Sequence, residues 1–159
     1  MSAFPAVLFD ESHSQAWTIR PEVASAINPV KPADASYRIA ADILRRRGHT
    51  VAAHTHGALD ESVLAGVDVL VLAHPSEPTW ERVVPGAAPK LDAAELDAIE
   101  AFVRTGGGLV VLGECDQDKY GNNLNELLGR FGLHIRTTTV IDPLHRANEV
   151  DTWLVAQPG

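Results

Sequence analysis

The stretch from Gly106 to Phe131 constrains the fold of this chain more than any other. Leu109 to Leu112 is a continuous apolar run after a triple glycine, a pattern typical of a strand buried on both faces of a parallel sheet. A polar turn follows, and after it come leucines at helical spacing that end before Gly132. Strand, polar turn and helix in this order predict a turn at the carboxyl edge of the sheet, where open α/β sheets bind ligands.

The helix after this turn has a clear start and a clear apolar face. Asn122 or Asn123 is expected to cap its N-terminus, because a side-chain oxygen there can accept a bond from a free backbone amide. The face predicted to be buried consists of Leu124, Leu127, Leu128 and Phe131.

Short apolar runs and helical patterns alternate along the rest of the chain. The runs predicted to be strands are Ala6–Phe9, His49–Thr55, Val67–Ala73, Leu133–Ile141 and Trp153–Val155. One helix is expected from Asp34, as its cap, to Arg47, with Tyr37, Ile39, Ala40, Ile43 and Leu44 facing inward, and a short helical turn is expected over Asp60–Ala65. The clearest helix begins at a capping box of Asp92 and Glu95 and ends at Gly106, with Leu96, Ile99, Phe102 and Val103 buried.

This alternation predicts a three-layer α/β sandwich with a mainly parallel sheet. We expect the strand Leu109–Leu112 at its centre, between the strands containing Ala6–Phe9 and Val67–Ala73. A proline-bearing segment, Ser14–Pro32, is expected to be a long ordered loop over the candidate site.

Composition excludes several classes of function. The chain has 159 residues and a formal net charge of −8, which disfavours a nonspecific grip on nucleic acid or an anionic membrane. A single cysteine, Cys115, fits a reducing compartment, and no apolar run is long enough to cross a bilayer. We expect one cytoplasmic domain over residues 1–159, part of a longer protein because the sequence stops just after an apolar run.

Polar residues recur where successive strands end, so the parallel sheet would gather them at one crevice. The candidate ligand-binding residues are Asp10, Glu11, His13, Trp17, His74, Glu77, Glu114, Cys115, Asp116, Lys119, Tyr120, Asn122 and Asn123. Taken alone, each of them is better explained as a residue that solvates a loop end, and only the set as a whole indicates a site. No cofactor is implied by any of these residues.

The segment Val111-Leu112-Gly113-Glu114-Cys115-Asp116-Gln117 resembles the nucleophile turn of class I glutamine amidotransferases, an apolar strand followed by Gly-x-Cys-x-Gly. With Asp10-Glu11-Ser12-His13 and Lys119-Tyr120-Gly121-Asn122-Asn123, nearly the whole chain resembles the amidotransferase-like domains of gliding-motility and intraflagellar-transport (GIFT) proteins. This resemblance implies a flavodoxin-like three-layer α/β/α sandwich that binds a ligand or partner and generally lacks the catalytic apparatus.

Departures from the amidotransferase pattern argue against glutamine hydrolysis. Asp116 and Gln117 stand where a small residue and a glycine would form the tight turn and its oxyanion hole. The thiol of Cys115 is flanked by acidic residues, which disfavour the thiolate. The His-x-Glu pair that the family places downstream is missing, because neither His134 nor His145 has that partner.

Three classes of function stay open from the sequence. The first is a non-catalytic module that binds a small polar ligand, such as a sugar or nucleotide, or another protein domain. The second is a hydrolase, with Cys115 as nucleophile and His13, His74 or His145 as base, or with Asp10, His13, His74 and Asp116 around a divalent metal. The third is a structural domain that forms a homo-oligomer, for which a large exposed apolar patch would be the sign.

Overall fold

The computed structural model describes residues 4–14, 17–75, 89–113, 121–138 and 140–154. Its centre is a four-stranded sheet, and every pair of neighbouring strands in it is parallel. The strands are β1 (Ala6–Asp10), β2 (Thr50–His54), β3 (Val69–Leu72) and β4 (Gly108–Val111), in the spatial order β2-β1-β3-β4. The predicted α/β fold with a mainly parallel sheet is therefore confirmed.

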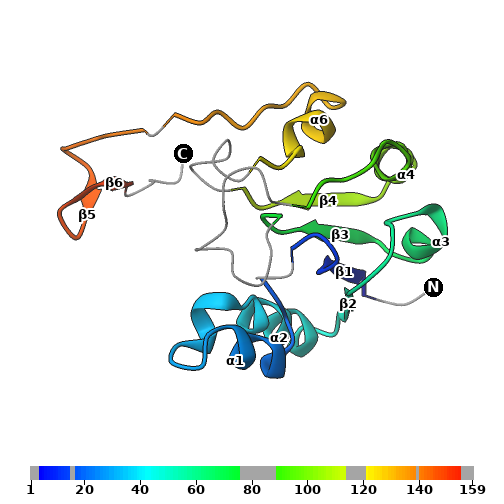
Figure 1. The fold of residues 1–159 in the computed structure, drawn as a ribbon, viewed down its shortest axis with the longest axis horizontal. Helices are drawn as coiled ribbons and strands as arrows, with labels where there is room; N and C mark the ends of the chain where they lie inside the picture. Colours follow the sequence, from blue (N-terminus) through cyan, green and yellow to red (C-terminus); the bar gives the residue numbers. More distant parts are fainter. Residues whose placement is uncertain (1–3, 15–16, 76–88, 114–120, 139, 155–159) are drawn as a thin grey trace.

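Helices cover both faces of this sheet (Figure 1). In chain order they are α1 (Pro21–Ile27), the 3-10 turn η1 (Pro32–Ala35), α2 (Arg38–Arg46), α3 (Glu61–Leu64), α4 (Ala93–Arg104) and α6 (Leu124–Gly129). Strand alternation divides the core in two, because successive side chains point to opposite faces. On one face, Leu8, Leu70 and Leu72 pack against residues of α3, α4 and α6. On the other face, Val7, Phe9 and Val71 pack against Ala41 of α2.

The predicted central strand is wrong in its position. β4 pairs with β3 alone among the described strands, so β1 and β3 are the central strands and β4 is the outer one. The register places Val110 beside Val71, and the side chain of Val110 is 42% exposed. β4 is therefore not buried on both faces.

The strand predicted over Leu133–Ile141 is also absent from residues 133–138 and 140–141. Ile135 instead bonds a side chain, because the Asn125 carboxamide accepts from its N–H at 2.8 Å and donates to its carbonyl at 2.9 Å. The chain then runs away from the sheet to a small antiparallel hairpin of β5 (Arg146–Ala147) and β6 (Val150–Leu154) (Figure 1). Residues 133–138 and 140–154 thus form an extended arm, in place of the predicted strand.

The helix predicted from Asp34 to Arg47 differs from the structure in where it starts and in which of its residues are buried. Asp34 lies in η1, and α2 begins at Arg38 without a side-chain cap. Tyr37 and Leu44 pack on the core as expected, but Ile39 and Ile43 are 61% and 38% exposed, and Ala40 is exposed too. Helix α1 lies within the segment Ser14–Pro32, which is therefore not a continuous loop.

The other predicted helices are present, but Phe102, Val103 and Phe131 are only half-buried and α6 ends at Gly129. The Asp92 side chain accepts from Glu95 N at 2.9 Å, and the Glu95 side chain accepts from Asp92 N at 2.8 Å, which completes the capping box of α4. Asp60 caps α3. In the part of the chain that the structure describes, no helix is long and apolar enough to cross a membrane.

Candidate functional site

The structure describes seven of the thirteen candidate ligand-binding residues. They are Asp10, Glu11, His13, Trp17, His74, Asn122 and Asn123. The other six, Glu77, Glu114, Cys115, Asp116, Lys119 and Tyr120, lie outside the described residues. The site can therefore be built from the ends of β1 and β3 and from the start of α6.

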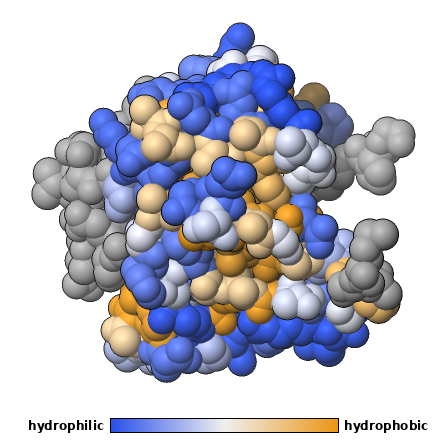
Figure 2. Space-filling view, turned by 90° about the vertical axis from the view of Figure 1, so that its right-hand side faces the viewer, coloured by the Kyte–Doolittle hydropathy of each residue, from blue (hydrophilic) through white to orange (hydrophobic). Residues whose placement is uncertain are grey.

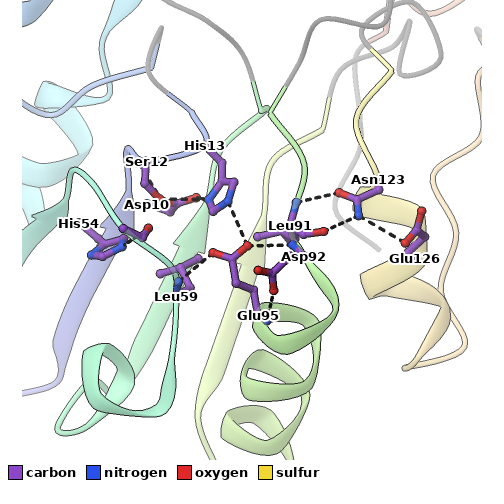
Figure 3. Close-up of polar contacts among 11 residues, drawn as sticks. Asp10, Ser12, His13, His54, Leu59, Leu91, Asp92, Glu95, Asn123 and Glu126 are labelled. Carbon is purple, nitrogen blue, oxygen red and sulfur yellow. Dashed lines mark hydrogen bonds and ion pairs between the residues drawn. The ribbon is translucent and has the colours of Figure 1, made fainter.

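His13 bridges two buried carboxylates just beyond the end of β1 (Figure 3). Its Nδ1 lies 2.9 Å from Asp10 Oδ2, and its Nε2 lies 3.4 Å from Glu95 Oε2. The exposed fractions of Asp10, His13 and Glu95 are 1%, 8% and 4%. Ser12 completes the group, because its hydroxyl donates to Asp10 Oδ1 at 2.6 Å.

The charge state of His13 follows from these contacts. Burial by itself lowers the pKa of an imidazole, but the hydrogen bond to Asp10 and the negative charges of Asp10 and Glu95 outweigh it. The pKa of His13 is consequently raised above its ordinary value. When the ring is protonated both nitrogens donate, one to each carboxylate.

Glu95 belongs to this site, a role that its sequence pattern does not predict. The pattern predicts only its part in the capping box, which the structure confirms. Its carboxylate also accepts from Leu59 N at 2.8 Å and faces His13. From the sequence, a glutamate at the third position of a helix predicts only the bond to the cap residue. Its contact with His13 depends on where the sheet places the end of β1.

Glu11 forms a second buried network, directed at the loop that follows β1. Its carboxylate accepts from Thr18 Oγ1 at 2.9 Å, from Ile19 N at 2.7 Å and from Arg20 Nε at 2.8 Å. Glu11 is 2% exposed, so these three donors replace the water that a carboxylate would otherwise bind. Glu11 therefore fixes the course of the loop into α1.

Trp17, one of the candidate ligand-binding residues, lies in the same loop against Tyr37. The two ring centroids are 5.4 Å apart and the rings are tilted by 32°. This is the geometry of an offset aromatic pair, which stabilises packing beyond the buried area alone. Trp17 thus joins the loop to the start of α2.

His74 follows β3 and differs from His13. It is 1% exposed, and burial lowers its pKa to about 4, so the ring is neutral at pH 7. Ser14 lies beside the same strand end, because its hydroxyl donates to the carbonyl of Ala73 at 2.7 Å. The segments after β1 and β3 are therefore joined at the sheet edge.

The two asparagines before α6 have separate roles. Asn122 Oδ1 accepts from Leu124 N at 3.1 Å and so caps the helix, while its buried Nδ2 has no hydrogen-bond partner in the described structure. Asn123 occupies the N-cap position without bonding a helix amide through its side chain, and its Nδ2 donates to Glu126 Oε2 in the first turn at 3.3 Å. Its carboxamide accepts from Leu91 N at 3.0 Å and donates to Leu91 O at 2.8 Å, tying α6 to the start of α4 (Figure 3).

The described residues contain no group of three or more side chains suited to hold a metal ion. The metal candidates Asp10 and His13 are bonded to each other, and Asp116 lies outside the described residues. His145, a candidate base, pairs instead with Asp142 on the exposed arm, 2.8 Å away. Of the three candidate bases, His13 has each ring nitrogen facing a carboxylate.

Apolar hollows lie away from this polar edge. One, of about 490 Å³, runs beside β4 and is lined by Val103, Leu109, Val111, Leu128, Phe131, Leu133, His134 and Ile135. Another, of about 370 Å³, lies between α3 and α4, where Leu64, Ala98 and Phe102 contribute to its walls. On the side that carries these two helices, Figure 2 shows apolar surface bordered by hydrophilic residues.

Comparison with known proteins gives one informative likeness. No protein-family model matches the chain, and no curated protein matches it. The solved structure of the mmIFT52 N-terminal domain superposes with a TM-score of 0.58 over 92% of this chain, at 17% identity. This chain spans 53% of the length of that solved chain. At this identity the likeness shows that the two share a fold.

Proposed function

We propose that this chain is a non-catalytic binding domain of the GIFT type, which takes a small polar ligand or a segment of a partner protein at the carboxyl edge of its sheet. Two lines of argument support the proposal. The fold is shared with the mmIFT52 N-terminal domain, a domain from the intraflagellar-transport group that the motifs around Asp10 and Asn122 also resemble. The second line of support is the pattern of hydrogen bonds that the polar groups at the sheet edge make or lack.

Three of the ionisable groups that the structure describes at this edge, Asp10, Glu11 and His13, have partners within the fold. Both oxygens of Glu11 accept internal donors, and both nitrogens of His13 face carboxylates. A general base needs a free nitrogen directed at the nucleophile, so His13 is unsuited to activate Cys115. The neutral His74, with a pKa of about 4, is a weak base.

The observation that carries a binding role is the amide of Asn122. Its Nδ2 is buried without an acceptor in the described structure, which costs about 1–3 kcal/mol for an isolated donor. A hydroxyl, carbonyl or carboxylate oxygen from a ligand in the crevice would satisfy it. Sugars, nucleotides and extended peptides all present such oxygens, and Lys119, three residues earlier in the sequence, would add a cation.

Asn122→Asp separates capping from binding. The aspartate keeps the oxygen that accepts from Leu124 N, so the helix stays capped and folding is retained, but the donor is removed. A thermal-shift screen with hexoses, nucleoside diphosphates and polar peptides identifies the probe, and calorimetry then compares wild type with the variant. We expect Asn122→Asp and Lys119→Ala to weaken binding at least tenfold, with Lys31→Ala as a control in an exposed turn.

Two results would contradict the proposal. Wild-type affinity in both variants would place the binding site elsewhere. Turnover of glutamine or of a simple ester that is lost in Cys115→Ser would make the domain a hydrolase.

A further inference from the structure

The candidate site joins three separate elements through the side chains of Asp10, His13 and Glu95. Asp10 ends β1, His13 begins the loop to α1, and Glu95 lies in the first turn of α4. Asn123 fixes Leu91, just before that turn, to the start of α6. A continuous set of polar contacts thus runs from the β1 loop through α4 to α6 (Figure 3).

We propose that His13 is a proton-operated clasp between the β1 loop and the N-terminus of α4, closed when its imidazole is protonated and released from Glu95 when the proton leaves. The clasp is a property of the fold itself and does not depend on what the crevice binds.

The geometry determines which end opens. A neutral imidazole carries one N–H, so it can donate to only one of the two carboxylates. The Asp10 contact is the shorter, at 2.9 Å against 3.4 Å for Glu95, and Ser12 Oγ lies 3.1 Å from the same nitrogen. The proton therefore stays on Nδ1, and the lone pair of Nε2 then faces a buried carboxylate oxygen, which is unfavourable.

Glu95 does not become unbonded when the clasp opens. Its oxygens still accept from Leu59 N and Asp92 N, so α4 keeps its cap. What is lost is the link between α4 and the β1 loop. The charged groups that face His13 from the elements around it are Asp10 on β1 and Glu95 on α4, among the residues that the structure describes.

The direction of the pH effect follows from linkage. Asp10 and Glu95 hold the pKa of His13 above its ordinary value, so the folded protein keeps this proton at a pH where the unfolded chain has released it. The stabilisation is complete below about pH 6.5, the ordinary pKa of histidine, and is lost as pH rises through the higher pKa of the folded state. The clasp therefore opens toward alkaline pH.

Two measurements on the ligand-free protein test this proposal. An NMR titration follows the His13 ring in wild type, and we expect its midpoint above 6.5. The same titration in Glu95→Gln is expected to give a lower midpoint, because the amide cannot attract the imidazolium. A wild-type midpoint at or below 6.5 would overturn the proposal without any variant having to fold.

The second measurement is urea unfolding between pH 6 and pH 9. For each unit by which the pKa of His13 is raised, the wild-type unfolding constant should increase about tenfold across this window. His13→Gln should remove that increase, whereas the matched control His56→Gln, at an exposed histidine, should retain it. An equal pH dependence in wild type and His13→Gln would exclude the clasp, and it would leave the proposed binding role of Asn122 untouched.

Discussion

The ends of β1 and β3 place two buried histidines at the same edge of the sheet, and their chemistry is opposite. His13 lies between two carboxylates and its pKa is raised, whereas His74 has its pKa lowered to about 4 by burial. Their exposed fractions, 8% and 1%, differ little. Burial alone therefore does not decide whether a histidine is charged; the acidic partners that the fold brings to it do.

Among the changes that test this difference between the two histidines, removal of Glu95 should lower the free energy of unfolding most. Glu95→Ala leaves His13 with one carboxylate and deprives Leu59 N and Asp92 N of their acceptor. Loss of one partner from a buried ionic network costs about 3–5 kcal/mol. Urea unfolding at pH 6 measures it, with the exposed Glu61→Ala as control. A loss below about 1 kcal/mol would show that Glu95 contributes only its cap.

Acid should act through His74 in the opposite direction to its action on His13. The unfolded chain binds a proton at His74 near pH 6.5, while the folded state resists until about pH 4, so stability is lost as pH falls through this window. The loss is on the order of 3 kcal/mol. His74→Gln should flatten the unfolding free energy between pH 6.5 and pH 4. An unchanged slope would mean that His74 is already charged in the folded protein.

Cutting the link between α4 and α6 should have an intermediate effect. Asn123→Ala leaves the N–H and carbonyl of Leu91 without their partner, which costs about 1–3 kcal/mol for partly buried groups. The loss should be the same at pH 6 and pH 8, because a carboxamide does not titrate there. Asn28→Ala, in an exposed turn, is the matched control, and chemical unfolding at both pH values is the measurement.

The smallest effect is expected at the exposed pair of His145 and Asp142. Their side chains are 61% and 38% exposed, so water and salt screen the attraction that is so effective around His13. His145→Ala should leave the unfolding midpoint within experimental error of wild type. A clear loss of stability would indicate that the arm docks on the rest of the molecule.

The parts of the fold that were predicted are those with local signals. The apolar runs that became β1 and β3 and the capping box of Asp92 are each contained in a few neighbouring residues. The failures needed distant partners. Leu133–Ile141 has the composition of a strand, but Ile135 bonds Asn125 instead of β4. Likewise, packing of Tyr37 and Leu44 on the core set the phase of α2.

The same division holds at the candidate site. Asp10 and His13 could be predicted because they follow an apolar run, and the sheet then brought them to its edge. Glu95 could not, because its contact with His13 joins a strand end to a helix that comes much later in the chain. The charge of either histidine was equally beyond prediction, since it depends on such partners.

The strand order β2-β1-β3-β4 also bears on how the protein folds as it leaves the ribosome. Residues up to Leu72 already contain three adjacent strands, and β4 later adds to the outer side of β3. Among the described strands, none has to enter between two that are already paired, so this sheet can grow in the order of synthesis. The contacts of His13 are completed later than its own strand, because Glu95 reaches it only after the ribosome has made α4.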